Sequence, residues 1–115
     1  MNANVALNID EIGNYVWSVL HSLAAHYPNN PNMDKQYHAI MLVKSIGKLL
    51  PCSFCSQHFQ EYIDKNPPQV NSRTSFCKWI CKAHNSVNKE LDKQLFPNDI
   101  DKLDERWLYY YEKTS

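Results

Sequence analysis

Residues 71–91, NSRTSFCKWICKAHNSVNKEL, decide the fold because they predict one long amphipathic helix. Asn71 or Ser72 can cap its start, since a side-chain oxygen there accepts a hydrogen bond from a first-turn N–H. An apolar stripe follows at helical spacing, formed by Phe76, Ile80, Ala83, Val87 and Leu91. Beside it runs a second row, Cys77, Cys81, His84 and Asn88. Cys81, His84 and Asn88 share a helical face that an ordinary core would fill with leucine.

The same periodicity predicts helices before and after this one. Their expected ranges are 10–27, 34–50, 52–65 and, as a short closing helix, 100–111. Pro51 is expected in the first turn of the third helix, where its missing N–H costs nothing. No segment alternates as a half-buried strand does. We therefore predict an all-α fold, an antiparallel four-helix bundle with a short fifth helix, in one domain spanning residues 1–115 with a flexible stretch at 1–9.

Composition narrows the possible functions. The 115 residues are 43% hydrophobic, which suits one compact domain. Twelve Lys plus Arg balance twelve Asp plus Glu, so charge indicates neither nucleic acid nor a membrane surface as a partner. No run approaches the roughly 18 apolar residues of a membrane span, and the start lacks a secretory pattern. With only two glycines, the chain has no G-x-G-x-x-G loop for a nucleotide.

Cys52 and Cys55 form a C-x-x-C motif at the expected start of the third helix. Unpaired backbone N–H groups and the helix dipole stabilise a thiolate there, and the thiolate is the attacking species in disulfide exchange. Two intervening residues keep both sulfurs within one turn. We expect Cys52 to meet a substrate and Cys55 to point inward. These two residues are the predicted catalytic pair.

Two other interpretations of the cysteines remain open at this point. A structural zinc site in a non-catalytic interaction module could draw on six side chains: Cys52, Cys55, His58, Cys77, Cys81 and His84. The second cysteine pair is C-x-x-x-C within a helix, however, which is not how zinc thiolates are usually presented. An inactive helical scaffold is the other alternative. A thioredoxin-like domain is excluded because no strands surround the motif.

Four ordered blocks of the sequence resemble the Erv/ALR sulfhydryl oxidases, which include the augmenter of liver regeneration and related viral enzymes. The blocks are WSVLH (17–21) followed by AAHYP (24–28), PCSFC (51–55) with His58-Phe59, WICKAHNSVNKELDK (79–93), and DERW (104–107). The resemblance covers about residues 13–107.

The resemblance implies a bundle that holds FAD, usually as a homodimer, with the fifth helix packed against the cofactor. Electrons would pass from a protein or small-molecule dithiol to the Cys52–Cys55 disulfide, then to the flavin, and then to oxygen or a cytochrome. Cys55 would be the sulfur near the flavin, with a thiolate that donates charge to its ring. No metal site is implied. The location would be an oxidising space such as the mitochondrial intermembrane space, or a viral factory, virion or host cytoplasm.

Matched residue by residue, the resemblance also implies the cofactor-binding side chains. Those on the first helix and the turn after it are Gly13, Trp17, His21, His26 and Tyr27. Those on the long helix and just after it are Cys81, His84, Asn85, Asn88, Lys89 and Lys93, and the last segment adds Arg106 and Trp107. Trp79 is expected in the core, and His58 on the outer face of its helix.

The chain departs from the family pattern at several positions. Residues before Ile9 contain no cysteine, so a second C-x-x-C on a flexible arm is missing from this sequence. The family's bridge from the cysteine matching Cys81 to one before the last helix cannot form, because residues 96–98 are Phe-Pro-Asn. We expect Cys77 and Cys81 as thiols, or Cys77 bonded across a dimer interface. Asn14 replaces a frequent basic residue, and Asp92 stands where glycine is usual.

Overall fold

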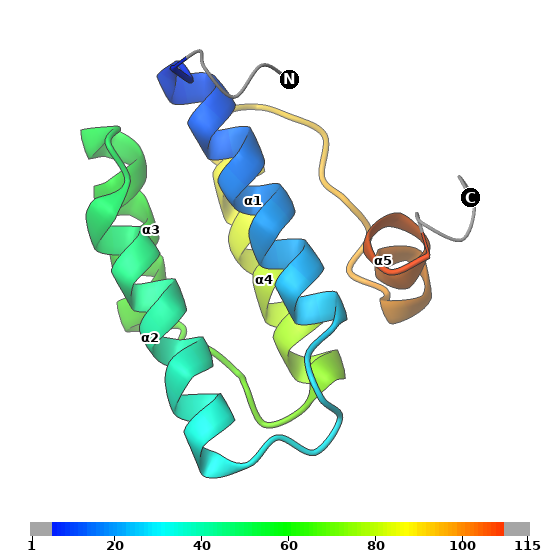
Figure 1. The fold of residues 1–115 in the computed structure, drawn as a ribbon. Helices are drawn as coiled ribbons and strands as arrows, with labels where there is room; N and C mark the ends of the chain where they lie inside the picture. Colours follow the sequence, from blue (N-terminus) through cyan, green and yellow to red (C-terminus); the bar gives the residue numbers. More distant parts are fainter. Residues whose placement is uncertain (1–5, 110–115) are drawn as a thin grey trace.

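The computed structural model describes residues 6–109, which form five α-helices (Figure 1). They are α1 (Ile9–Ala25), α2 (Met33–Leu49), α3 (Ser53–Lys65), α4 (Arg73–Glu90) and α5 (Ile100–Trp107). This part of the chain contains no strand, which confirms the predicted all-α class. Nor does it contain a helix with the length and apolar character needed to cross a membrane.

The helices pack as two pairs joined at one edge. α1 lies along α4 and α2 lies along α3, while α3 also contacts α4 (Figure 1). The short α5 packs against α1 and α4, on the far side from the α2–α3 pair. Between α4 and α5 the chain runs as an extended connection over residues 91–99. The α1–α4 pair therefore lies between the helix that carries the C-x-x-C motif and the closing helix.

Side-chain caps set where the helices begin. Asn8 and Glu11 form a capping box, so α1 starts at Ile9, the last residue of the stretch predicted to be flexible. Ser72 caps α4 as predicted. Cys52 is itself the cap of α3. The prediction that Pro51 lies within the first turn is therefore wrong, because Pro51 precedes the capping residue. Residues 110 and 111, predicted to end the last helix, lie outside the described residues.

The core lies where the two helix pairs meet. Leu20 of α1, Val43 of α2, Phe59 of α3 and Ile80 of α4 are almost completely buried. Trp79 is buried as predicted and donates its ring N–H to the carbonyl of Asn66. Each such aliphatic or aromatic side chain stabilises the fold by about 1.5–3 kcal/mol when it leaves water.

An ion pair holds α5 against the start of α4. The guanidinium of Arg73 donates two hydrogen bonds to the carboxylate of Asp104, at 2.7 and 3.0 Å. It also donates to the carbonyl of Ala25, at the end of α1. Asp104 is buried, and bidentate arginine–carboxylate pairs are among the stronger polar contacts in proteins. This contact fixes where Trp107, one helical turn farther on, lies relative to α1.

Two further contacts shape the connection from α4 to α5. α4 ends in a Schellman motif: the N–H of Lys93 donates to the carbonyl of Asn88, and that of Asp92 to Lys89. Asp92 has a φ of 55°, the left-handed conformation that favours glycine. Farther along, the side-chain amide of Asn85 pairs with both backbone groups of Phe96, at 2.8 and 2.9 Å. The connection is thereby held against α4.

Candidate functional site

The C-x-x-C motif forms the first turn of α3. Cys52 caps the helix, and its Sγ accepts a hydrogen bond of 3.3 Å from the N–H of Cys55. Hydrogen bonds from the side chain and backbone of Cys55 lower the pKa of Cys52. Burial, together with the hydrogen bond to Cys52, raises the pKa of Cys55 to about 11. Of the two sulfurs, Cys52 is therefore the one more readily deprotonated, which suits it to disulfide exchange.

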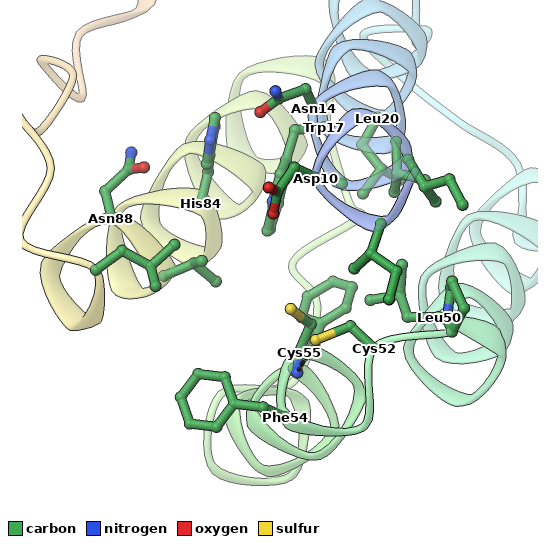
Figure 2. Close-up of a pocket in the computed structure, with 18 of the residues that line it drawn as sticks. Asp10, Asn14, Trp17, Leu20, Leu50, Cys52, Phe54, Cys55, His84 and Asn88 are labelled. Carbon is green, nitrogen blue, oxygen red and sulfur yellow. Dashed lines mark hydrogen bonds between the residues drawn. The ribbon is translucent and has the colours of Figure 1, made fainter. Parts of the chain in front are cut away.

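Both cysteines line a cavity of about 300 Å³ between α1, α3 and α4 (Figure 2). Figure 2 shows the two sulfur atoms side by side, with Trp17 of α1 and His84 of α4 on the other side of the space. The rings of Trp17 and His84 are stacked, with their centroids 4.5 Å apart and their planes 6° from parallel. Apolar side chains supply most of the remaining wall, among them Val16, Leu20, Leu50, Phe59, Val87 and Leu91. The cavity thus combines a dithiol with flat aromatic and apolar surfaces.

A second cavity, of about 520 Å³, adjoins the first. The two share four lining residues: Asn14, His84, Asn88 and Lys93. The second cavity extends toward α5 and the connection before it, where Phe96, Arg106 and Trp107 line its wall. The guanidinium of Arg106 lies over the ring of Phe96. Together the cavities form an elongated site with cysteines at one end and cations and aromatic rings toward the other.

Two histidines lie at the junction of the cavities. The Nε2 atom of His21 is 2.9 Å from the Nδ1 atom of His84, and the ring of His21 stacks on that of Trp107. Burial, His84 and Arg106 lower the pKa of His21 to about 3. Burial, Arg106 and Lys93 lower the pKa of His84 to about 4. Both rings are therefore neutral at pH 7, and one donates to the other.

Comparison with known proteins agrees with this geometry. The sequence model of the Erv1/Alr family matches residues 14–108, which include most of the site just described. The chain belongs to the Erv1/Alr family. This confirms the resemblance that the four sequence blocks indicated.

The relatives of this Erv1/Alr chain include plant, yeast and viral proteins. It is 37% identical over 88% of its length to the rice FAD-linked sulfhydryl oxidase ERV1 and covers 51% of that protein. It is 36% identical to the mitochondrial FAD-linked sulfhydryl oxidase ERV1 of Saccharomyces cerevisiae, covering 87% of this chain and 52% of the relative. The FAD-linked sulfhydryl oxidase of African swine fever virus is 35% identical over 69% of this chain and is covered to 66%. The chain thus spans about half the length of the first two relatives.

Solved structures of yeast Erv1 share the fold. The crystal structure of the yeast Erv1 core superimposes with a TM-score of 0.85, at 32% identity, covering 94% of this chain and 90% of the other. The FAD-binding domain of Erv1 from the same yeast gives a TM-score of 0.83 at 34% identity, covering 89% and 95%. The part of the family that this chain matches is therefore the helical core.

Ten of the thirteen predicted cofactor-binding residues of this Erv1/Alr chain line the joined cavities. They are Gly13, Trp17, His21, Cys81, His84, Asn85, Asn88, Lys93, Arg106 and Trp107. Asn85 and Cys81 also hold the connection before α5: the Cys81 thiol lies 3.9 Å from the carbonyl oxygens of Phe96 and Pro97.

Three predicted binding residues lie away from both cavities. Tyr27 is buried and donates its hydroxyl hydrogen to the carbonyl of Val70, so it belongs to the core. His26 is exposed and contacts the carbonyl of Ser22, one turn back. Lys89 is exposed on α4, one turn before Lys93. The side chains of these three residues therefore project away from both cavities.

Two residues that line the first cavity, Val87 and Leu91, were expected in the apolar core. Val87 and Leu91 continue the apolar stripe of α4, but Leu91 is 49% exposed and both face the first cavity. The sequence indicated this position, because the apolar stripe of α4 extends beyond the stretch that the other helices can cover.

His58 was expected on the outer face of its helix. It is half-buried, and its Nε2 lies 3.0 Å from Ser86 Oγ of α4.

The four cysteines and nearby histidines of this Erv1/Alr chain do not converge. In the region from residue 6 to 109, no three His, Cys, Asp or Glu side chains are placed to hold one metal ion. Cys77 and Cys81 are buried free thiols, and burial raises the pKa of both, that of Cys77 to about 11. The geometry does not favour the zinc interpretation, which needs four converging ligands.

Proposed function

We propose that this chain is an FAD-dependent thiol oxidase that forms disulfide bonds in dithiol substrates, using Cys52 and Cys55. One observation carries the proposal: Cys52 and Cys55 line an elongated cavity, and the stacked rings of Trp17 and His84 line its other walls. The names of the plant, yeast and viral relatives, all FAD-linked sulfhydryl oxidases, support the same activity. We also propose that residues 1–115 act as one sulfhydryl oxidase domain.

The residues present fit FAD. The joined cavities are of the size that ligand sites commonly have, and aromatic rings offer flat surfaces for planar ring systems. Lys93 and Arg106 supply positive charge for a pyrophosphate in the absence of a glycine loop. The indole N–H of Trp107 is buried without a hydrogen-bond partner among the described residues, so it is free to donate to a bound group. Trp17, His21, His84, Asn88 and these three residues would hold the cofactor.

The proposed exchange reactions conserve atoms and electrons. A substrate thiolate attacks Sγ of Cys52 in the oxidised pair, forming a mixed disulfide and releasing Cys55. A second substrate thiolate then attacks the substrate sulfur, so the substrate leaves as a disulfide and Cys52 leaves as a thiolate. The Cys52–Cys55 pair has now gained two electrons. When bound, FAD supplies the two-electron acceptor that returns the pair to its disulfide.

The pKa shift of Cys52 favours its proposed role, whereas that of Cys55 does not. A leaving thiol departs faster when its pKa is low, and hydrogen bonds from Cys55 lower the pKa of Cys52. Burial raises the pKa of Cys55, so within the protein alone Cys55 is held as a thiol. The proposed thiolate at Cys55 therefore needs stabilisation that the described residues do not provide.

We propose oxygen, reduced to hydrogen peroxide, or a cytochrome as the final acceptor. A homodimer is also proposed. Two exposed apolar rows support it, Tyr15, Val19 and Leu23 on α1 and Met33, Tyr37 and Met41 on α2, each with a four-residue spacing. A second copy would cover such rows. The mitochondrial and viral relatives support an oxidising space such as the mitochondrial intermembrane space, or a viral factory, virion or host cytoplasm.

An absorbance spectrum combined with a dithiol assay tests the proposed function. The purified protein should absorb near about 450 nm as flavoproteins do and should produce peroxide or consume oxygen when given dithiothreitol. Cys55→Ala should abolish this turnover while leaving the flavin bound. Cys77→Ala, which removes a buried thiol outside the site, is the matched control and should retain activity. A colourless protein, or a Cys55→Ala variant with full activity, would refute the proposal.

A further inference from the structure

A groove on α3 lies beside the redox site but does not belong to it. It has a volume of about 370 Å³ and is lined by Leu50, Ser53, Ser56, Gln57, Gln60, Glu61 and Asp64. The α3 residues are mostly three or four apart, so they share one side of the helix. Cys52, Cys55 and Phe59 line the first cavity instead. The helix thus separates a polar groove from the cofactor cavity.

Leu50 connects the groove to the cavity that contains the reactive sulfur of Cys52. This residue lines both the groove and the first cavity, and Ser53, at the head of the groove, directly follows Cys52. Figure 2 shows Leu50 on one side of the sulfur pair and Phe54 on the other. Phe54 is 60% exposed, and Leu49 at the end of α2 is 79% exposed. A chain lying in the groove would therefore cross an apolar rim as it reaches Cys52.

The dimensions and polar groups suit an extended polypeptide. From Ser53 to Asp64 the helix rises by about 16 Å, which about five extended residues would span. Ser56 and Gln60 are already fixed, because Ser56 donates to the carbonyl of Gly47 and Gln60 donates to Ser56. Among the described residues, the Gln60 side-chain oxygen accepts no hydrogen bond and is free for a backbone N–H.

The far end of the groove is acidic. Glu61 and Asp64 lie one turn apart, and in the part of the chain that the structure describes neither forms an ion pair with Lys, Arg or His. Glu61 accepts one hydrogen bond, from the amide of Gln57. These carboxylates lie about 13 to 18 Å along the helix from Cys52, a distance that about four to six extended residues cover. The groove is therefore complementary to a basic side chain at that separation from a cysteine.

We propose that this groove docks a cysteine-bearing segment of a protein substrate, in extended form, with an apolar residue beside the reactive cysteine and a lysine or arginine about five residues away. The inference rests on the proposed thiol oxidase function and adds a substrate class to it. Small dithiols reach Cys52 without using the groove.

Steady-state oxidation of matched peptides tests the docking groove. The probes are C-x-x-C peptides with lysine or glutamate about five residues from the first cysteine, on either side, and dithiothreitol as the small dithiol. For the full chain with its flavin, we expect the lysine peptides to exceed the glutamate peptides about three- to tenfold in kcat/KM at low salt. Raising the salt to about 0.5 M should remove most of this preference.

Substitutions inside and outside the groove test where the preference for lysine peptides arises. Glu61→Gln combined with Asp64→Asn should abolish the lysine preference through KM, with the rate on dithiothreitol unchanged. Asp34→Asn combined with Glu105→Gln removes the same charge elsewhere and should keep the preference. Leu49→Ala should lower kcat/KM for peptides with an apolar residue beside the cysteine and leave dithiothreitol oxidation unaffected. If the preference survives in the Glu61/Asp64 variant, the groove does not dock substrates.

A binding measurement separates this inference from the proposed function. Lysine peptides with both cysteines replaced by serine cannot react, so their fluorescence anisotropy reports docking alone. Binding that weakens in the Glu61/Asp64 variant supports the groove even if no thiol is oxidised. Turnover of dithiothreitol without any difference between the peptides would overturn the groove and leave the oxidase function standing.

Discussion

The Nε2 atom of His21 lies 2.9 Å from the Nδ1 atom of His84, a contact that joins α1 to α4 at the centre of the site. Each ring also stacks on a tryptophan, His21 on Trp107 and His84 on Trp17. A single neutral pair thus ties together the aromatic walls of both cavities. Protonation of the second nitrogen would break the pair, because two donors would then face each other.

The histidine pair predicts that the protein loses stability as the pH falls. Unfolded histidines take up protons below about pH 6.5, whereas burial keeps His21 and His84 neutral until their pKa values of about 3 and 4. The unfolded state therefore binds more protons between about pH 6.5 and 4, and the free energy of unfolding falls. The slope reaches at most about 1.4 kcal/mol per pH unit for each histidine, and less for the half-exposed His84.

Urea unfolding at several pH values between 7.5 and 4.5 measures this slope. Replacing both histidines, His21→Leu with His84→Leu, should make the pH dependence shallower whatever it does to stability at pH 7.5. Equal slopes in the double variant and the parent would show that the pair does not titrate as described.

Gly13 predicts opposite effects on stability and on cofactor content. A Cβ atom added there meets no atom within 4 Å, and the residue lines the first cavity within α1. Gly13→Ala should therefore raise the free energy of unfolding of the flavin-free protein by about 0.5–1 kcal/mol, because glycine is a poor helix former. Gly13→Leu should instead fill cavity space and lower the flavin bound per chain. Thermal unfolding and the ratio of absorbance at about 450 nm to that at about 280 nm measure the two effects. A leucine variant with full flavin content would contradict the assignment of Gly13 to the site.

Two substitutions of Asp92 are expected to stabilise the fold. Its left-handed backbone conformation ends α4, and its negative charge lies at the end of the helix that disfavours anions. Asp92→Gly should raise the free energy of unfolding by roughly 0.5–1 kcal/mol, and Asp92→Asn by less, because asparagine removes only the charge. Asp92→Val should destabilise the protein, since a β-branched side chain resists positive φ. Denaturant unfolding ranks the three variants, and a valine variant as stable as the parent would refute the strain.

Asp104 predicts a stability effect that is linked to the cofactor site. Asp104→Asn leaves the shape of the side chain but removes one partner of the buried pair with Arg73. We expect a loss of about 2–4 kcal/mol in the free energy of unfolding, because the guanidinium loses its charged partner. The neighbouring exposed Glu105 provides the control, and Glu105→Gln should cost under about 0.5 kcal/mol. Weaker flavin retention in the Asp104 variant alone would show that the pair positions Trp107.

The fold could be predicted from the sequence because apolar periodicity and capping residues are local signals. Most predicted helix ends lie within two residues of the observed ones, and Pro51 was misplaced because Cys52 itself serves as the cap. The Arg73–Asp104 pair could not be predicted, since no local pattern relates residues 31 positions apart. Most of the site followed from the family resemblance. The resemblance also implied His26, Tyr27 and Lys89, which lie away from both cavities because the direction of a side chain near the end of a helix depends on tertiary packing.

Two hydrogen bonds join the side chain of Asn85 to the backbone of Phe96, beside the Cys81 thiol, and they bear on how a new copy of the protein folds. The connection before α5 is attached by hydrogen bonds, which do not depend on the redox state of the surroundings. No disulfide is needed at this point, since Cys81 beside the connection is a free thiol. A newly made copy can therefore reach its final shape under reducing conditions, before any catalyst of cysteine pairing is at work.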